Sequence, residues 1–144
     1  MLKNDLKFSN QNNTADGSKR AFVGFAGLNT LWFNTGTLCN LACKGCYIES
    51  SPVNDKLLYL DLEDVEYYLN EIQVNNWPCK IIGFTGGEPF MNKDIIEIIE
   101  LCLEKKFEVL VLTNAMQPMQ NKLNALQKLS KYQNLKLRIS LDHF

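Results

Sequence analysis

Apolar runs and helical stripes alternate along this sequence after residue 28. Short runs rich in Leu, β-branched and aromatic residues predict four strands, at Leu31–Phe33, Lys80–Thr85, Val109–Leu112 and Leu135–Leu141. Apolar residues at helical spacing predict three helices between them, marked by Leu62–Ile72, Ile95–Cys102 and Leu123–Leu129. The alternation of strand and helix is typical of an α/β fold in which βα units form a parallel sheet with right-handed crossovers.

Boundary signals support this division of the chain. Asp61 is a candidate N-cap for the first helix, with Asp64 three residues later, and Trp77-Pro78 closes that segment. Asn92 and Asp94 are start signals for the second helix. Residues 1–28 begin with a stretch rich in Asn, Gln, Ser and Lys and predict a flexible polar leader, so we expect the folded domain to span residues 29–144.

Composition excludes several classes of protein. Hydrophobic residues make up 46% of the 144 residues, which is enough for a core, and the formal net charge of −1 includes no block of Lys or Arg. We therefore expect no nucleic-acid partner and no membrane partner. Five cysteines, an odd number, argue against a secreted disulfide framework and favour a cytoplasmic protein. Lys19-Arg20 precede a short apolar stretch, but a polar leader lies before them, so a signal peptide is rejected.

Three of these cysteines, Cys39, Cys43 and Cys46, lie within eight residues and are followed at once by Tyr47. One loop can bring thiolates at this spacing to a single centre, and the spacing is too tight for a set of internal disulfides. Three soft ligands without a nearby fourth cysteine indicate a metal centre with one open position, where a substrate or cofactor can bind.

The ends of the predicted strands carry the other candidate residues. In a parallel sheet these ends lie at one edge, where ligands of α/β folds bind. The first strand leads to the three cysteines, and the later ones lead to Gly86-Gly87-Glu88-Pro89, Thr113-Asn114, and Ser140 with Asp142. The glycines permit a close backbone approach, and Pro89 favours an extended Glu88, whose carboxylate could then pair with an ammonium group.

Simpler interpretations exist for several of these residues. Taken alone, the Gly-Gly-Glu-Pro segment favours a strand-to-helix turn with a solvated Glu, and its place one βα unit after the cysteines reverses this preference. The polar positions Lys136, Arg138, Ser140 and Asp142 indicate either a strand lining a wet interior or an edge strand with a solvated face. Cys102 lies on an apolar helix stripe and Cys79 at the opposite end of its strand, so both are predicted to be structural. His143 follows the last strand and is expected at a frayed terminus.

Together, the Cys-x3-Cys-x2-Cys run after the first strand and the Gly-Gly-Glu-Pro segment after the second resemble the radical S-adenosylmethionine (radical SAM) superfamily. Leu112-Thr113-Asn114 and the segment 138–142 resemble the third and fourth strand ends of that family. The resemblance covers about residues 29–142. It implies a partial (β/α)6 barrel of which this chain holds the first four strands, apparently truncated.

The resemblance also implies cofactors and their ligands. Cys39, Cys43 and Cys46 would hold a 4Fe-4S cluster, whose fourth iron binds the amine and carboxylate of S-adenosylmethionine. Reductive cleavage of that cofactor would give a 5′-deoxyadenosyl radical that abstracts a substrate hydrogen. Gly86, Gly87 and Glu88 would contact the methionine ammonium. The other expected cofactor-binding residues are Pro89, Asn114, Tyr47 toward the adenine, and Ser140 and Asp142 toward the ribose or carboxylate.

One departure from the family pattern concerns Gly45, because an aromatic residue usually precedes the third cysteine there and Tyr47 would have to replace it. The resemblance further implies a low-potential electron donor such as flavodoxin or ferredoxin, an unidentified substrate, and a partner that supplies missing barrel strands. Two alternatives stay open. The chain could be an inactive or partner-dependent fragment, or a non-catalytic module that binds zinc, although a structural zinc site usually has four protein ligands.

Overall fold

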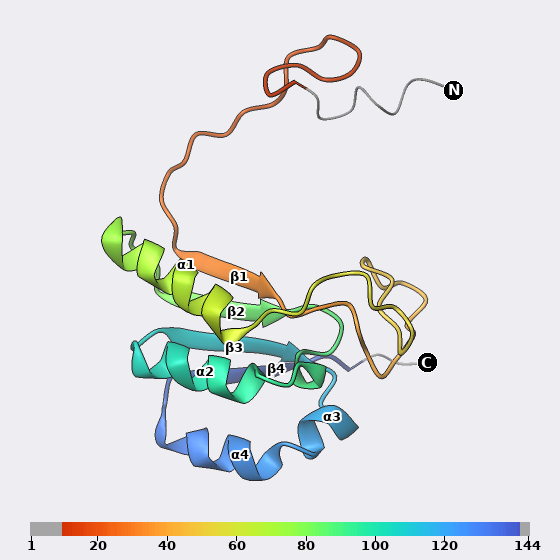
Figure 1. The fold of residues 1–144 in the computed structure, drawn as a ribbon, viewed down its shortest axis with the longest axis vertical. Helices are drawn as coiled ribbons and strands as arrows, with labels where there is room; N and C mark the ends of the chain where they lie inside the picture. Colours follow the sequence, from red (N-terminus) through yellow and green to blue (C-terminus); the bar gives the residue numbers. More distant parts are fainter. Residues whose placement is uncertain (1–9, 142–144) are drawn as a thin grey trace.

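The computed structural model describes residues 10–141 and contains one sheet of four parallel strands in the order β1-β2-β3-β4. The strands are β1 (Thr30–Asn34), β2 (Ile81–Thr85), β3 (Glu108–Thr113) and β4 (Leu135–Ile139), and each pairs in parallel with the next one along the chain (Figure 1). The predicted α/β class, strand order and parallel pairing are confirmed. All four strands therefore end at the same edge of the sheet, called here the C-terminal edge.

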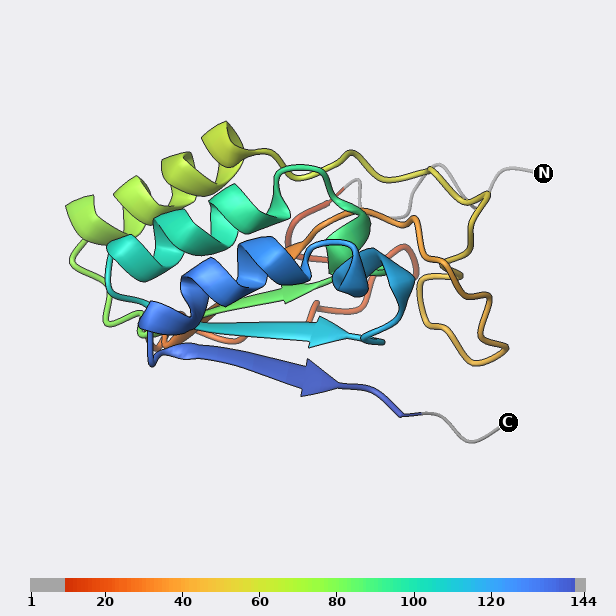
Figure 2. The same cartoon turned by 90° about the horizontal axis from the view of Figure 1, so that it is seen from below.

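The helices lie on one face of this sheet, as Figure 2 shows. They are α1 (Leu62–Val74), α2 (Ile95–Glu104), α3 (Gln117–Gln120) and α4 (Leu123–Lys128), with short 3-10 turns η1 (Pro89–Met91) and η2 (Leu129–Lys131). The third predicted helix is therefore shorter than its apolar stripe, because Leu129 begins a 3-10 turn. In the part of the chain that the structure describes, no helix is long and apolar enough to cross a membrane.

The first helix begins where its sequence predicts. The Asp61 carboxylate accepts a hydrogen bond of 2.8 Å from the backbone N–H of Asp64, and Glu63 and Asp64 place negative charge in the first turn. Both features stabilise the positive end of the helix dipole. The buried side of α1 consists of Val65, Leu69 and Ile72, as the spacing of its apolar residues predicts. The second helix begins after Asp94, which makes no side-chain cap hydrogen bond.

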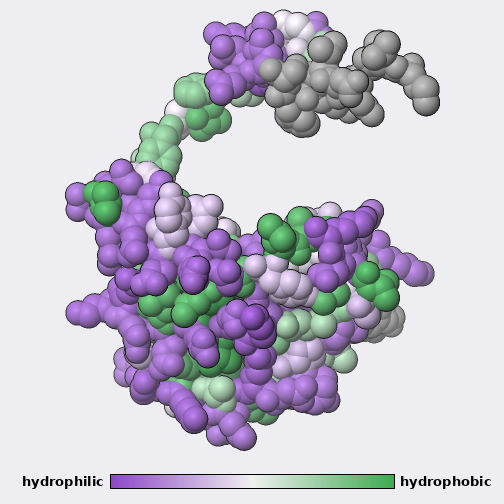
Figure 3. Space-filling view, in the orientation of Figure 1, coloured by the Kyte–Doolittle hydropathy of each residue, from purple (hydrophilic) through white to green (hydrophobic). Residues whose placement is uncertain are grey.

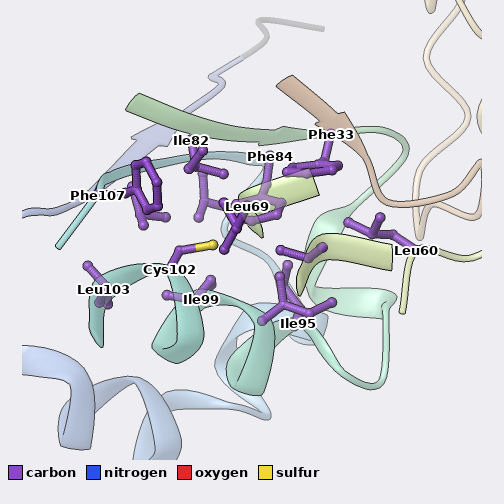
Figure 4. Packing of buried hydrophobic residues seen from close by; sticks show 14 of the residues in the cluster. Phe33, Leu60, Leu69, Ile82, Phe84, Ile95, Ile99, Cys102, Leu103 and Phe107 are labelled. Atoms are coloured by element: carbon purple, nitrogen blue, oxygen red, sulfur yellow. The ribbon is translucent and has the colours of Figure 1, made fainter. Parts of the chain in front are cut away.

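The core fills the space between the helices and the sheet. Figure 4 shows side chains from β1, β2, α1 and α2 pointing toward one another. Phe33 stacks on Phe84 with ring centroids 5.7 Å apart, and Cys102 is a fully buried member of the same cluster. Burial raises the pKa of Cys102 to about 12, so this thiol is neutral and acts as an apolar core residue. The structural role predicted for Cys102 agrees with this environment.

The other face of the sheet carries no helix (Figure 2). Trp32 points to this face and remains 45% exposed, with its ring lying on Gly83 of the neighbouring strand. A Cβ atom at Gly83 would lie 2.3 Å from the Trp32 ring, so the glycine is what allows the indole to lie flat across β2. Lys136 and Arg138 of β4 also point to this open face and are exposed. The strand with the alternating polar face is thus an edge strand with respect to the described residues.

Residues 10–28 form no strand of the sheet. They contain one isolated bridge between Asn13 and Lys19, followed by an extended segment that leads to β1 (Figure 1). Phe22 and Val23 in this segment are 88% and 90% exposed, and Figure 3 shows the segment in hydrophobic colour between two hydrophilic regions. Phe25 contacts Trp77, with ring centroids 5.6 Å apart. The division into a leader and a domain at residue 28 stays a prediction.

We predict that Gly83→Ala lowers the free energy of unfolding by about 1–3 kcal/mol, because the added methyl group overlaps the Trp32 ring and displaces it. Urea denaturation followed by tryptophan fluorescence measures this loss. Gly45→Ala is the matched control, since nothing lies within 4 Å of a Cβ atom at that position. Equal stability of the two variants would show that the indole lies elsewhere in solution.

We also predict that the 144-residue chain self-associates as its concentration rises. Among the described residues β4 pairs only with β3, and Leu137 and Ile139 on it are 38% and 50% exposed. An edge of this kind is a template for pairing with another chain. Light scattering should show oligomers that Ile139→Lys reduces, whereas Leu58→Lys, at an exposed loop position, should not. A monomer at every concentration would contradict the prediction.

Candidate functional site

A cavity of about 770 Å³ lies at the C-terminal edge of the sheet. All four strands lead into it, because residues following β1, β2, β3 and β4 line its wall. The segment after β1 supplies Cys39, Cys43 and Cys46. The other predicted residues that line the cavity are Tyr47, Gly86, Gly87, Asn114 and Ser140. The convergence that the sequence predicts at one edge of the sheet is therefore present in the structure.

The three cysteines share this cavity as free thiols, with Cys39 buried and Cys43 and Cys46 half-buried. Backbone hydrogen bonds shape their loop, since Cys39 N–H donates to Ser51 at 3.2 Å and Cys46 N–H donates to Cys43 at 3.1 Å. Within residues 10–141, no three His, Cys, Asp or Glu side chains stand close enough together to hold a metal ion. The structure thus brings the thiols to one cavity but not to one point.

Backbone N–H groups stabilise negative charge on two of the sulfurs. Leu41 N–H donates to Cys39 Sγ at 3.4 Å, and Ser50 N–H donates to Cys46 Sγ at 3.3 Å. Burial raises the pKa of Cys39 above its ordinary value. The hydrogen bond from the Leu41 N–H lowers this pKa, and the nearby charge of Glu88 raises it, so that the pKa stays raised. Burial also acts to raise the pKa of Cys46, but the N–H groups around it outweigh burial, so this pKa is lowered. Cys46 therefore loses its proton more readily than Cys39 does.

The backbone around Gly86 and Gly87 approaches residues 36–38 closely and so positions the start of the cysteine loop. Gly87 N–H donates to the carbonyl of Gly36, and Glu88 N–H donates to that of Leu38, both at 2.9 Å. A Cβ atom at Gly87 would lie 2.1 Å from the Leu38 carbonyl oxygen, and Gly86 has a φ of +139°. Only glycine fits both requirements. The close approach that the sequence predicts is made here by the chain's own loop, directly before Cys39.

Glu88 is 2% exposed and accepts three hydrogen bonds from the chain itself. Its carboxylate receives the N–H of Phe90 at 3.1 Å, the hydroxyl of Thr113 at 2.8 Å and the N–H of Asn114 at 2.9 Å. It connects the end of β2 to the turn after β3 and does not line the cavity. Pairing of Glu88 with a cofactor ammonium stays a prediction, as do the expected contacts of Pro89, which is buried as the first residue of η1.

The remaining predicted residues lie as follows. Tyr47 lines the cavity and is 76% exposed. Ser140 lies beside β3, where its N–H donates to the Thr113 carbonyl at 2.9 Å. Asp142 and His143 lie outside the described residues. Cys79 does not line the cavity, and burial raises its pKa. Its position is consistent with the structural role that the sequence predicts.

The sequence interpretation missed two asparagines that organise the site. Asn92, expected only as a helix start signal, is buried, and its amide donates to the carbonyls of Leu60 at 2.7 Å and Thr35 at 3.3 Å. It thereby ties both ends of the cysteine loop to η1. Asn40, between the first two cysteines, accepts a hydrogen bond of 2.9 Å from the amide of Asn114. Neither contact has a local signal, because each joins residues far apart in sequence.

These features coincide with a known family. The sequence pattern of the Radical SAM superfamily matches residues 33–144, and the chain belongs to this superfamily. Membership supports radical chemistry that depends on S-adenosylmethionine as the general class of activity.

Two relatives match over most of the chain. It is 25% identical over 101 residues to the S-adenosylmethionine-dependent nucleotide dehydratase of Selenomonas ruminantium, covering 70% of this chain and 35% of the relative. It is 33% identical over 105 residues to the antilisterial bacteriocin subtilosin biosynthesis protein AlbA of Bacillus subtilis (strain 168), covering 72% of this chain and 22% of the relative. The chain thus spans about a third or less of the length of these proteins.

Solved structures of Streptococcus suis SuiB share the fold. The structure with bound S-adenosylmethionine gives a TM-score of 0.66 at 23% identity, covering 81% of this chain and 26% of SuiB. The structure bound to the precursor peptide SuiA gives 0.64 at 22% identity, with 81% and 25% covered. At this identity the likeness shows the fold alone, and it confirms the predicted α/β arrangement.

We predict that Glu88→Ala lowers the free energy of unfolding by about 1–3 kcal/mol or more, because donors from Phe90, Thr113 and Asn114 lose their acceptor in a buried place. Chemical denaturation of the metal-free protein measures the change. Glu97→Ala, at an exposed position of α2, is the control and should change stability little. If both variants were equally stable, the carboxylate network would contribute nothing.

Proposed function

We propose that this chain is the core of a radical SAM enzyme that binds a 4Fe-4S cluster through Cys39, Cys43 and Cys46, and S-adenosylmethionine beside it. The single observation that carries the proposal is the cavity at the C-terminal edge, where three thiols of one loop face residues from the three other strand ends. Its volume of about 770 Å³ lies within the range of cofactor sites.

The donor set fits this cluster. Thiolates are the ordinary ligands of iron–sulfur clusters, and three of them leave one iron of a 4Fe-4S cluster free to bind another molecule. Metal binding deprotonates the thiols, and the N–H groups of Leu41 and Ser50 already face the sulfurs that then carry negative charge. When bound, the cluster and its cofactor supply one-electron cleavage of a carbon–sulfur bond, which leads to hydrogen abstraction from a substrate.

In this proposal the residues of the chain bind and orient S-adenosylmethionine. Gly86 and Gly87, together with Asn114 and Ser140 from the later strand ends, give the cavity polar groups besides the cysteines. Leu41, Leu112 and Leu141 provide apolar wall between them. This combination suits a ligand with a charged amino-acid end and a less polar body, which is the chemistry of S-adenosylmethionine. Tyr47, an exposed aromatic residue in the wall of the cavity, would contact the adenine base.

For the substrate we propose a peptide. The relative that is 33% identical serves bacteriocin biosynthesis, and SuiB, which shares the fold, has a structure bound to a precursor peptide. The nucleotide dehydratase relative makes a nucleotide the competing class. The proposal further includes a low-potential electron donor such as flavodoxin or ferredoxin, a partner segment that extends the sheet beyond β4, and a cytoplasmic location.

A zinc-binding module is the alternative without catalysis. In it the three cysteines hold Zn²⁺ with an outside ligand, whereas a structural zinc site usually has four protein ligands. Among the described residues the remaining cysteines, Cys79 and Cys102, do not line the cavity and so supply no fourth ligand there. Anaerobic reconstitution separates the two possibilities, because an iron–sulfur protein is brown with broad visible absorption and a zinc protein is colourless. Cleavage of S-adenosylmethionine by the reconstituted chain then distinguishes an active core from an inactive fragment.

We predict that Cys39→Ala, Cys43→Ala and Cys46→Ala each lose the cluster, because each removes one of three thiolate ligands. Iron counted after anaerobic reconstitution, together with visible absorption, measures the loss. Cys79→Ala and Cys102→Ala are matched controls that should retain their iron, since neither side chain lines the cavity. Loss of the cluster from a folded Cys79→Ala protein, or full iron content in all three loop variants, would overturn the assignment.

A further inference from the structure

A hydrogen-bonded chain joins the end of β2 to the sulfur of the first cysteine. The Glu88 carboxylate accepts the backbone N–H of Asn114 at 2.9 Å, and the Asn114 side-chain Nδ2 donates to Cys39 Sγ at 3.8 Å. The same Nδ2 group donates to Asn40 Oδ1 at 2.9 Å. Two strand ends and the cysteine loop therefore meet at one amide group.

The partners of this amide determine which way it points. Asn114 Oδ1 accepts the backbone N–H of Met116 at 3.0 Å, and a backbone N–H can only donate. The oxygen of the amide must face Met116, so its NH2 group faces Cys39 and Asn40. Its two N–H bonds can serve both acceptors at once. Hydrogen bonds thus fix both the oxygen and the nitrogen of the Asn114 side-chain amide.

Hydrogen bonds of the preceding residue, Thr113, fix the turn that carries Asn114. Thr113 is buried, donates its hydroxyl to Glu88 at 2.8 Å and accepts the N–H of Ala115 at 3.0 Å. Ala115 has a φ of +55°, a conformation that an L-residue adopts only where its surroundings impose it. These contacts fix the backbone on both sides of Asn114. A side chain fixed in this way serves positioning better than a mobile surface amide does.

We propose that Asn114 is a positioning residue that hydrogen-bonds the Cys39 sulfur and raises the reduction potential of the cluster held there, with Glu88 and Asn40 fixing its orientation. The proposal rests on the proposed function, because it needs a cluster at Cys39. An N–H donor withdraws negative charge from a thiolate ligand, and hydrogen bonds to sulfur are among the factors that set iron–sulfur potentials. Together with Leu41 N–H, the Asn114 amide gives Cys39 two such donors.

The test is a redox titration of the reconstituted 144-residue chain, followed by electron paramagnetic resonance of the reduced cluster. Asn114→Ala removes the donor, so we expect a more negative potential, seen as an about two- to tenfold lower ratio of reduced to oxidised cluster at a fixed potential. Asn114→Asp keeps the shape but turns an oxygen toward the sulfur, so its shift should be larger in the same direction.

Gln117→Ala is the matched control, because it removes an exposed side-chain amide at the start of α3 whose hydrogen bond, among the described residues, goes to Asn121. It should leave the potential unchanged. Full iron content with an unaltered potential in both Asn114 variants overturns the inference and leaves the proposed function intact. A wild-type chain that holds no iron–sulfur cluster contradicts the proposed function itself and the inference with it. If Asn114→Ala fails to fold, the Asp variant decides alone.

Discussion

The close approach of residues 86–88 to residues 36–38 is the constraint on which the site depends. Beyond the paired strands β1 and β2, backbone hydrogen bonds continue from Gly87 to Gly36 and from Glu88 to Leu38. They extend the parallel pairing into what the sequence alone describes as two loops. Because the Leu38 carbonyl would lie 2.1 Å from a Cβ atom at Gly87, this extension exists only with glycine there. Cys39 is the next residue, so the backbone itself positions the first thiol.

The same short segment reaches the third strand with its side chain. Glu88 is attached through its backbone to the cysteine loop and through its carboxylate to Thr113 and Asn114. Burying a carboxylate is unfavourable unless hydrogen bonds compensate it, and three donors do so here. One residue therefore holds together three strand ends. A Gly-Gly-Glu sequence can in this way assemble a site from within the protein, whatever further contacts its atoms make with a bound ligand.

Sequence patterns predicted the fold because strands and helices have their own periods. Short apolar runs located all four strands, helical spacing located the buried side of α1, and the local signal of Asp61 located its start. The site was predictable only as a set of strand ends, since a parallel sheet brings those ends together. The direction of the Glu88 carboxylate and the Asn40–Asn114 contact were not, because residues 26 and 74 positions apart determine them. The spacing of apolar and polar residues within a helix or strand carries no information about contacts between residues so far apart.

The two faces of the sheet differ in a way that bears on the cavity at its C-terminal edge. In β1, Phe33 enters the core under the helices while Trp32 points to the open face, since successive side chains of a strand alternate. The helix side is filled by the buried side chains of the core cluster. The open side is occupied near its middle by the indole of Trp32 lying across Gly83. Polar groups and glycine backbone are instead concentrated in the cavity between the cysteine loop and the strand ends, where a ligand would displace neither the core side chains nor the indole.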